Sequence, residues 1–298
     1  MLGQKKATKN EAKNNKTVTQ IVKENQDFSI LHRALVRTGL DKALQETENL
    51  TVFAPNNAAF IASGLDQAKV NNMEVKQLTD VLKYHVLGTK VSAANILEKK
   101  SLYTATLEGK NIYVSALGSG KVLVNGIEVI TADLIAKNGI IHVVNKVILP
   151  PTKTIAELAT ITPELTELLK AVVATDLTGV LADTKKYFTV FAPINAGFKA
   201  IESVTTTLTK QQLTDVLFAH LSEKVLFAGN INNQLELPTL NQSAHLVFET
   251  TPKIGVKIKE KNDKLFSEFV NNDMGLQVDI IATNGVIHLI HEVLVPKL

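Results

Sequence analysis

Histidines are the side chains of this chain best suited to acid–base or metal chemistry, and four of them recur at matched places. His85 and His220 each end a run with helical periodicity, whereas His142 and His288 each follow Asn-Gly inside an apolar run. A histidine inside an apolar strand is more often a hydrogen-bonded core residue than a ligand. We therefore expect His142 and His288 to serve the architecture, and we expect His85 and His220 to meet the last carbonyls of their helices.

Other patterns that carry catalysis or bind metals are missing from the sequence. There is no cysteine, which excludes thiol catalysis, disulfides and zinc sites built on thiolates. Neither Gly-x-Ser-x-Gly nor a Walker-type phosphate loop occurs, and His288 and His291 would point to opposite faces of a strand. Asp80 and Asp215 recur, but their polar helical surroundings favour a solvated face or an ion pair. The sequence predicts a non-enzymatic protein without a metal or a cofactor.

The elements that position these histidines come in two copies. Three stretches recur in the same order, namely 51–60 as 189–198, 77–82 as 212–217 and 138–142 as 284–288. A constant order with drifting spacing indicates a duplicated domain, because loops absorb length changes and packed elements do not. We predict domain 1 over residues 17–150 and domain 2 over residues 151–298.

The first sixteen residues differ in composition from the rest. Five lysines against Glu11 give residues 1–16 a charge of +4 within a total of +3, so the remainder is close to neutral. We expect this polar segment to be a disordered tether. A near-neutral body offers no electrostatic footprint for nucleic acid. The sequence contains no apolar run of 18 residues, so we expect no membrane span, whereas a lipid anchor upstream stays open.

Periodicity places helices mainly in the first half of each copy and strands mainly in the second. Residues 17–44, 75–84 and 211–219 have helical patterns, and 51–54 is a short strand followed by Asn57, the expected N-cap of the next helix, as is Asn195. Asn-Gly at 125–126, 138–139 and 284–285 predicts hairpins, because both residues tolerate positive φ. The lysine-rich stretch 253–264 is expected to be an additional loop. This distribution predicts an α+β fold.

The order of these motifs resembles the fasciclin domain. The motifs are Ala-Pro-x-Asn-x-x-Phe after a strand, a helix ending in His, and Asn-Gly-x-x-His before a strand closed by Leu/Val-x-Pro. The resemblance covers nearly the whole chain twice and implies two tandem domains, each a β-wedge of about seven strands flanked by helices. It also implies an adhesion or interaction module that is extracellular, attached to the cell surface or periplasmic, as in bacterial lipoproteins and secreted proteins. Its partners would be extracellular-matrix or cell-surface proteins or polysaccharides.

The resemblance further implies where a partner would bind. A Tyr-His pair linked to integrin binding in animal members corresponds to Tyr84-His85, and in the second copy Ala219 replaces the tyrosine. An Asp-Ile pair also proposed for integrin contact has an amide in place of the acid in both copies, and Arg-Gly-Asp is absent, which weakens an integrin interpretation. The candidate partner-binding residues are Tyr84, His85, Asn95, Ile96, His220, Asn230 and Ile231.

Three alternatives stay open beside adhesion. A small-ligand or glycan-binding surface protein would have a pocket between the two domains, with apolar walls and convergent polar groups. A hydrolase would need two titratable groups within hydrogen-bond reach in a pocket. The lysines of 253–264 would bind acidic polysaccharide or form a solvated loop.

Overall fold

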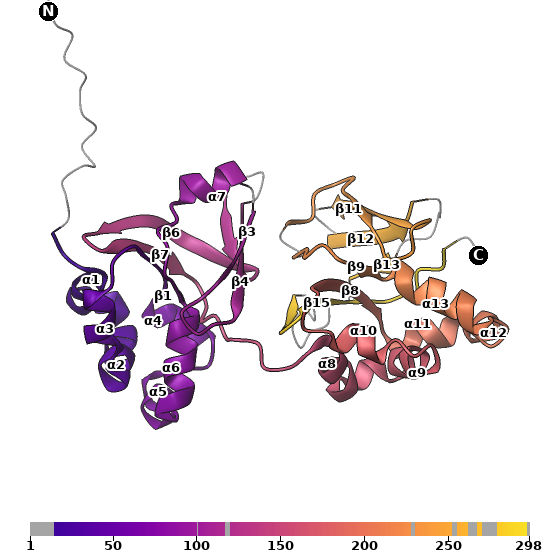
Figure 1. Cartoon of the computed structure of the whole chain (residues 1–298), viewed down its shortest axis with the longest axis horizontal. Helices are drawn as coiled ribbons and strands as arrows, with labels where there is room; N and C mark the ends of the chain where they lie inside the picture. The colour runs from indigo at the N-terminus through magenta and orange to yellow at the C-terminus, as the bar shows by residue number, and fades with distance from the viewer. Residues whose placement is uncertain are drawn as a thin grey trace, which may run out of the picture. The chain divides into compact units, whose positions relative to one another are not determined.

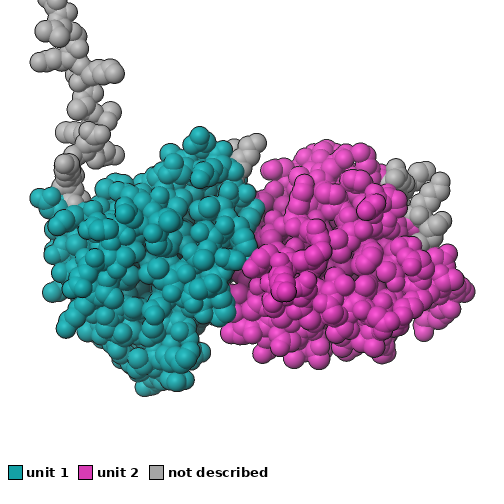
Figure 2. All heavy atoms as spheres, viewed as in Figure 1, with its two compact units in different colours: residues 1–150 teal, residues 151–298 magenta. Residues whose placement is uncertain are grey.

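A computed structural model of the chain describes residues 15–99, 101–116, 120–227, 230–251, 255–261, 267–269 and 279–296. The chain divides into two compact units, Met1–Pro150 and Pro151–Leu298, which Figure 2 shows in different colours. We call these units domain 1 and domain 2 and describe each by itself. Residues 1–14, which contain most of the predicted tether, lie outside the described ranges.

Domain 1 begins with helices and ends with strands (Figure 1). Its helices are α1 (Val18–Glu24), the 3-10 helix η1 (Gln26–Phe28), α2 (Ser29–Thr38), α3 (Leu40–Glu46), α4 (Asn57–Ala62), α5 (Gln67–Asn72), α6 (Val75–Tyr84) and α7 (Ala93–Lys99). Its strands are β1 (Leu50–Pro55), β2 (Val86–Leu87), β3 (Ser101–Ala105), β4 (Asn111–Ala116), β5 (Val122–Val124), β6 (Ile127–Ala136) and β7 (Gly139–Val144). They form one seven-stranded sheet in the order β2-β1-β7-β6-β5-β4-β3, which confirms the α+β prediction.

The parallel strands β1 and β7 divide the core of domain 1 into two halves. Every residue of both strands is buried, as expected for strands covered on both faces. Successive side chains point to opposite faces, so Leu50 and Val52 pack in the cluster that contains α1–α6 residues, while Phe53 packs with Tyr84 and Ile96 in a second cluster. Figure 1 shows α7 on the side of the sheet opposite to α1–α6.

Domain 2 repeats this order. Its helices are α8 (Ile155–Ile161), η2 (Pro163–Leu165), α9 (Thr166–Ala174), α10 (Thr178–Ala182), α11 (Asn195–Ala200), α12 (Glu202–Thr205) and α13 (Lys210–Ala219). Its described strands are β8 (Phe188–Pro193), β9 (Leu221–Ser222), β10 (Glu236–Pro238), β11 (His245–Thr251), β12 (Gly255–Glu260), β13 (Ser267–Glu268), β14 (Ile280–Ala282) and β15 (Gly285–Ile290). They form two sheets, β10-β11-β12-β13 and β14-β15-β8-β9, and β8 and β15 are the parallel pair that corresponds to β1 and β7.

One part of the lysine-rich stretch differs from its prediction as a loop. Residues 255–260 are strand β12, which pairs antiparallel with β11. Lys257 and Lys261 form ion pairs with Glu268 and Glu236, at 3.2 Å and 2.9 Å. Apolar and charged residues alternate over 256–259, as is typical of a strand, but the many lysines of the stretch favoured the interpretation as a loop. Residues 253, 254 and 262–264 lie outside the described ranges.

Two of the Asn-Gly pairs close hairpins by different means. Asn125 and Gly126 have φ values of 46° and 76° and join β5 to β6, as predicted. Asn138 and Gly139 join β6 to β7, yet neither has a positive φ, so the predicted reason was wrong at this turn. Glycine is needed there because a Cβ atom would lie 2.4 Å from the carbonyl oxygen of Leu50.

The asparagine of that second pair joins the hairpin to the helices. Asn138 Oδ1 accepts a hydrogen bond from the Val18 N–H, and its Nδ2 donates to the carbonyls of Leu44 and Thr47. Asn284 makes the same kinds of bonds in domain 2, with Ile155, Leu181 and Asp183. The recurrence of Asn-Gly therefore reflects these backbone connections.

Asn57 and Asn195 do not cap their own helices, contrary to prediction. Asn56 is the N-cap of α4 instead. The Oδ1 atom of Asn57 accepts from the N–H of Ile30 in the first turn of α2, at 3.0 Å. Asn195 accepts from the N–H of Glu167 in the first turn of α9, also at 3.0 Å. Each asparagine thus satisfies a free amide of a neighbouring helix, which sequence spacing alone does not reveal.

Candidate functional site

The predicted Tyr84-His85 pair lies at the carboxyl end of α6, with both side chains buried. His85 is the C-cap residue, with Nδ1 2.7 Å from the Val81 carbonyl and Nε2 2.9 Å from the N–H of Ile148. A carbonyl only accepts and an amide N–H only donates, so the ring is neutral with its proton on Nδ1. Burial lowers the pKa of His85 to about 4. The predicted contact with the last carbonyls of the helix is confirmed.

Tyr84 connects α6 to the β4 and β5 strands. Its hydroxyl donates to the Asn111 carbonyl at 2.8 Å and accepts from Asn125 Nδ2 at 2.9 Å. Asn125 Oδ1 in turn accepts from the Tyr113 N–H. Burial raises the pKa of Tyr84 to about 12, so the phenol keeps its proton at neutral pH. The side chain therefore acts as a structural hydrogen-bonding group.

His220 repeats the role of His85 at the end of α13. Its Nδ1 lies 2.8 Å from the Val216 carbonyl, its Nε2 accepts from the Leu294 N–H at 2.8 Å, and burial lowers its pKa to about 4. Partner binding by Tyr84, His85 and His220 stays a prediction. Each of these residues is at most 2% exposed, so a partner would need them to become accessible.

A buried threonine and a buried histidine hold the segment that follows β2 in domain 1. Thr51 Oγ1 donates to the Thr89 carbonyl at 2.6 Å and accepts from the Val91 N–H at 2.8 Å. His142 places Nε2 2.9 Å from the Val91 carbonyl. Because these three bonds hold the backbone at Thr89 and Val91, they fix the path of residues 89–91.

Asp133 extends this attachment into α7. The N–H of Asp133 donates to His142 Nδ1 at 3.3 Å, and its carboxylate accepts from the N–H of Ala93, the first residue of α7, at 3.0 Å. Asp133 adopts a positive φ of 57°. We call Thr51, Asp133 and His142 the loop clamp of domain 1.

Domain 2 contains the corresponding loop clamp, formed by Thr189, Asp279 and His288. Thr189 Oγ1 donates to the Lys224 carbonyl and accepts from the Leu226 N–H, and His288 Nε2 lies 2.7 Å from the Leu226 carbonyl. Asp279 donates its N–H to His288 Nδ1 at 3.3 Å and has a φ of 56°. The predicted interpretation of His288 as a hydrogen-bonded core residue is confirmed, as it is for His142.

Sequence reasoning missed the threonine and aspartate of each loop clamp. Thr51 and Thr189 open the recurrent Thr-Val-Phe-Ala-Pro phrase, whose recurrence was assigned to a strand and a helix start. Asp133 and Asp279 stand at the same distance before Asn-Gly in the two copies. That shared spacing was the available signal, and only the fold shows that it brings the carboxylates next to the histidines.

The predicted pair Asn95-Ile96 lies on α7, directly after the segment that the loop clamp holds. Asn95 is exposed, and its Oδ1 accepts from the hydroxyl and the N–H of Ser92. Ile96 is 1% exposed and packs in the same cluster as Tyr84, so the structure brings these two candidates together. Leu97, by contrast, is 44% exposed. Ile96 thus anchors this face of the helix in the core, while Asn95 and Leu97 beside it are exposed to solvent.

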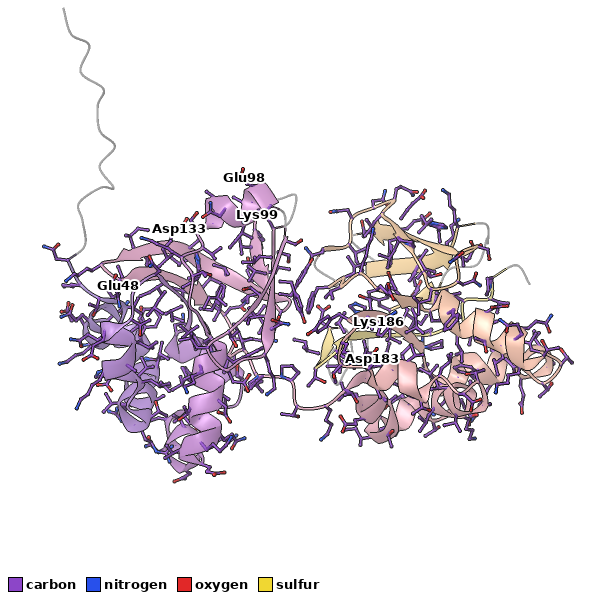
Figure 3. All side chains as sticks on the ribbon, in the orientation of Figure 1. Glu48, Glu98, Lys99, Asp133, Asp183 and Lys186 are labelled. Carbon is purple, nitrogen blue, oxygen red and sulfur yellow. The ribbon has the colours of Figure 1, made fainter. Side chains whose placement is uncertain are left out.

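The outer end of α7 adds two charged side chains. Figure 3 labels Glu98 and Lys99 there, and both are exposed. In domain 2, Ile231 is buried in the corresponding cluster, while Asn230 is half-buried. Partner binding by these residues is also a prediction.

The four buried histidines of the two domains are fully engaged in hydrogen bonds. Both ring nitrogens of each of the four buried histidines contact backbone groups, so none is available as a base or a ligand. Burial also lowers the pKa of His142 and His288, and the nearby carboxylates of Asp133 and Asp279 oppose this shift. Within the described ranges, no three metal-ligating side chains gather into a site, and no helix has the length and apolarity to cross a membrane.

Known proteins resemble both halves of the chain. A model of the Fasciclin domain family matches residues 26–150 and 163–296. Transforming growth factor-beta-induced protein ig-h3 of Sus scrofa is 30% identical over 256 residues, which cover 83% of this chain and 35% of that protein. The chain therefore spans about a third of that relative. Protein sll1483 of Synechocystis is 37% identical over 137 residues, which cover 45% of this chain and 74% of that protein.

A solved structure also aligns with the chain. This is the structure of a FAS1 domain pair from the insect cell adhesion molecule Fasciclin I. The alignment covers 92% of this chain and 98% of that one, with 19% identity and a TM-score of 0.42.

Proposed function

Because the chain belongs to the fasciclin domain family, we propose that it is a non-enzymatic adhesion or interaction module that works outside the cell, at its surface or in the periplasm. Its partner is an extracellular-matrix or cell-surface protein or a polysaccharide. This follows the resemblance from which the adhesion role was predicted, and the site described above supports it. A lipid anchor upstream would be compatible with this location.

The observation that carries the proposal is the loop clamp. In domain 1 the side chains of Thr51, Asp133 and His142 hydrogen-bond to backbone groups of residues 89–93, and together they fix the backbone that leads into α7. A surface element that is ordered before binding loses less conformational freedom when a partner docks. A fixed α7 with exposed Asn95 and Leu97 therefore suits recognition.

The chemistry of α7 favours some partners over others. Asn95 presents an amide, which forms hydrogen bonds with peptide groups and sugar hydroxyls but does not bridge a metal ion as a carboxylate does. Leu97 next to it adds apolar contact area. We therefore expect a partner that is recognised by hydrogen bonds and apolar packing, without a bridging metal.

The test compares two matched surface variants of the full chain. Arrays of matrix proteins and glycans first identify a bound partner. Leu97→Glu then places a charge on α7, and Ile61→Glu makes the same change on α4, where Ile61 is 64% exposed. We expect Leu97→Glu to weaken binding about tenfold or more, the size of a typical interface hot spot, and Ile61→Glu to leave affinity unchanged.

Equal affinity of both variants and the wild type would reject α7 as the binding surface. The absence of any partner on arrays that contain both matrix proteins and polysaccharides would count against the adhesion role itself. Circular dichroism of each variant checks that the fold is kept.

A further inference from the structure

Domain 2 contains an open groove that takes no part in the roles described so far. It lies between α9 on one side and α11 and α12 on the other, Leu213 of α13 also lines it, and its volume is about 530 Å³. Apolar and charged side chains both line it, among them Ala171, Ala174, Leu213, Lys170, Lys199 and Glu202. It belongs to domain 2 alone and is separate from α7.

Domain 1 shows what fills the corresponding place. There, α5 packs against α2, and Val70 of α5 is 1% exposed. The guanidinium of Arg37, on α2, donates to the carbonyls of Val70 and Met73 at 2.7 Å and 2.5 Å. Arg37 therefore holds a short amphipathic helix over the helical core.

Domain 2 lacks both parts of this arrangement. Ala174 of α9 stands where α2 has Arg37, because Gly39 and Asp176, both with positive φ, follow two positions later. The stretch 198–212 is three residues shorter than its counterpart 60–77. In its place α12 is a four-residue helix without a buried residue, and it does not pack against α9 as α5 packs against α2.

The charges around the groove match an amphipathic segment. Glu167 and Lys170 form an ion pair on the α9 side, at 2.8 Å. On the other side, Lys199 and Glu202 have no ion pair within the described part of the chain, so one charge of each sign is left for a ligand. Peptide helices that dock in grooves combine apolar anchors with such flanking charges.

We propose that the groove of domain 2 binds a short amphipathic helical segment of a protein partner. The segment places an apolar side chain over Ala171, Ala174 and Leu213, as α5 places Val70 in domain 1. Its acidic and basic side chains meet Lys199 and Glu202. Adhesion through α7 and peptide capture by domain 2 are therefore independent activities of the two domains.

A peptide with the sequence of residues 64–74 is the direct probe, because it is the segment that fills this place in domain 1. Its binding to the full chain is followed by methyl chemical shifts of Ala171 and Leu213, which report weak association. Ala174→Trp fills the groove from an exposed position, and Val173→Trp is the matched control, since Val173 is 58% exposed on the same helix and does not line the groove.

We expect saturable shifts with the wild type and with Val173→Trp, and affinity about tenfold lower with Ala174→Trp. A peptide with Val70→Asp should lose binding. No saturable shift, or equal affinity of Ala174→Trp and wild type, would overturn the proposal. Oligosaccharide binding that Ala174→Trp abolishes, without any peptide binding, would also overturn it and would assign the groove to sugars. None of these outcomes depends on Leu97, so they are separable from the test of α7.

Discussion

The two domains share the hydrogen bonds of their buried histidines and loop clamps and differ in the helices that cover their helical cores. His85 and His220 contact equivalent backbone groups, and the two loop clamps use the same three residue types. Arg37 and α5, in contrast, are replaced in domain 2 by Ala174 and by the shorter α12. Replacing a buried partner leaves an unsatisfied polar group, whereas changing a surface helix does not carry that cost. The contacts of the histidines and loop clamps are therefore common to both domains, whereas the Tyr84 hydrogen bonds and the packing of α5 belong to domain 1.

The largest loss of unfolding free energy is expected from replacing the glycine that begins β7 and β15, the second parallel strand of each domain. Gly139→Ala and Gly285→Ala place a Cβ atom 2.4 Å and 2.0 Å from the carbonyl oxygens of Leu50 and Phe188. The parallel strand pair must then separate, so we expect each variant to lose about 3 kcal/mol or more of unfolding free energy in its own domain. Gly179→Ala is the control, because nothing lies within 4 Å of the added atom. Urea unfolding followed by NMR signals of each domain measures the loss.

A larger loss in domain 2 would sharpen the comparison, since Gly285 also has a φ of 150°. Unchanged stability of either variant would show that the strands can move apart and that the close approach is not a constraint.

Acid should destabilise both domains to a similar extent. His85 and His220 have a native pKa of about 4, below the ordinary value of 6.5. The unfolded chain therefore binds more protons as pH falls, so their stabilising contribution is complete above pH 6.5 and is lost as pH falls toward 4. Full loss amounts to about 3 kcal/mol for each histidine. His142 and His288 change in the same direction, beside Asp133 and Asp279.

Unfolding free energies at about pH 7 and about pH 4.5 test this, because most carboxylates are still ionised at the lower value. His85→Gln should reduce the pH dependence of domain 1 and leave that of domain 2 unchanged. A pH dependence that the substitution does not alter would contradict the assignment.

The sequence was sufficient to predict the α+β class, α6 and the structural hydrogen bonding of the buried histidines. These features depend on periodicity and on recurrence, which are local or internal to the chain. The partners of Asn57 and Asn138 could not be predicted, because each side chain bonds to backbone that is distant in sequence. Asp133 was missed for the same reason: its carboxylate reaches Ala93 only after β6 and α7 have been brought together. The groove of domain 2 could not be predicted either, because it arises from the absence of an arginine and of a helix like α5 at the corresponding place.

Replacing the threonine of each loop clamp should cause a smaller loss of unfolding free energy. Thr51→Val keeps the shape of the side chain but leaves the Thr89 carbonyl and the Val91 N–H without their partner. We expect a loss of about 2 kcal/mol, and Thr189→Val should cost domain 2 a similar amount. Hydrogen exchange at the Val91 amide should accelerate, while amides of α2 keep their protection. Unequal losses in the two domains would show that the loop clamps are not equivalent.

The smallest loss of unfolding free energy should come from removing the hydrogen bonds between Arg37 and the segment of α5, which domain 1 alone has among the described residues. Arg37→Ala eliminates the two hydrogen bonds to Val70 and Met73 and leaves their carbonyls to water, so we expect a loss of about 1 kcal/mol. Arg33→Ala, an exposed change on the same helix, is the control. Hydrogen exchange should accelerate within α5 and stay constant in α6, because the deleted bonds end on α5 and the residue that follows it. If α5 keeps its protection, apolar packing of Val70 alone holds the helix in place, and the alanine at position 174 cannot be the reason that domain 2 has an open groove.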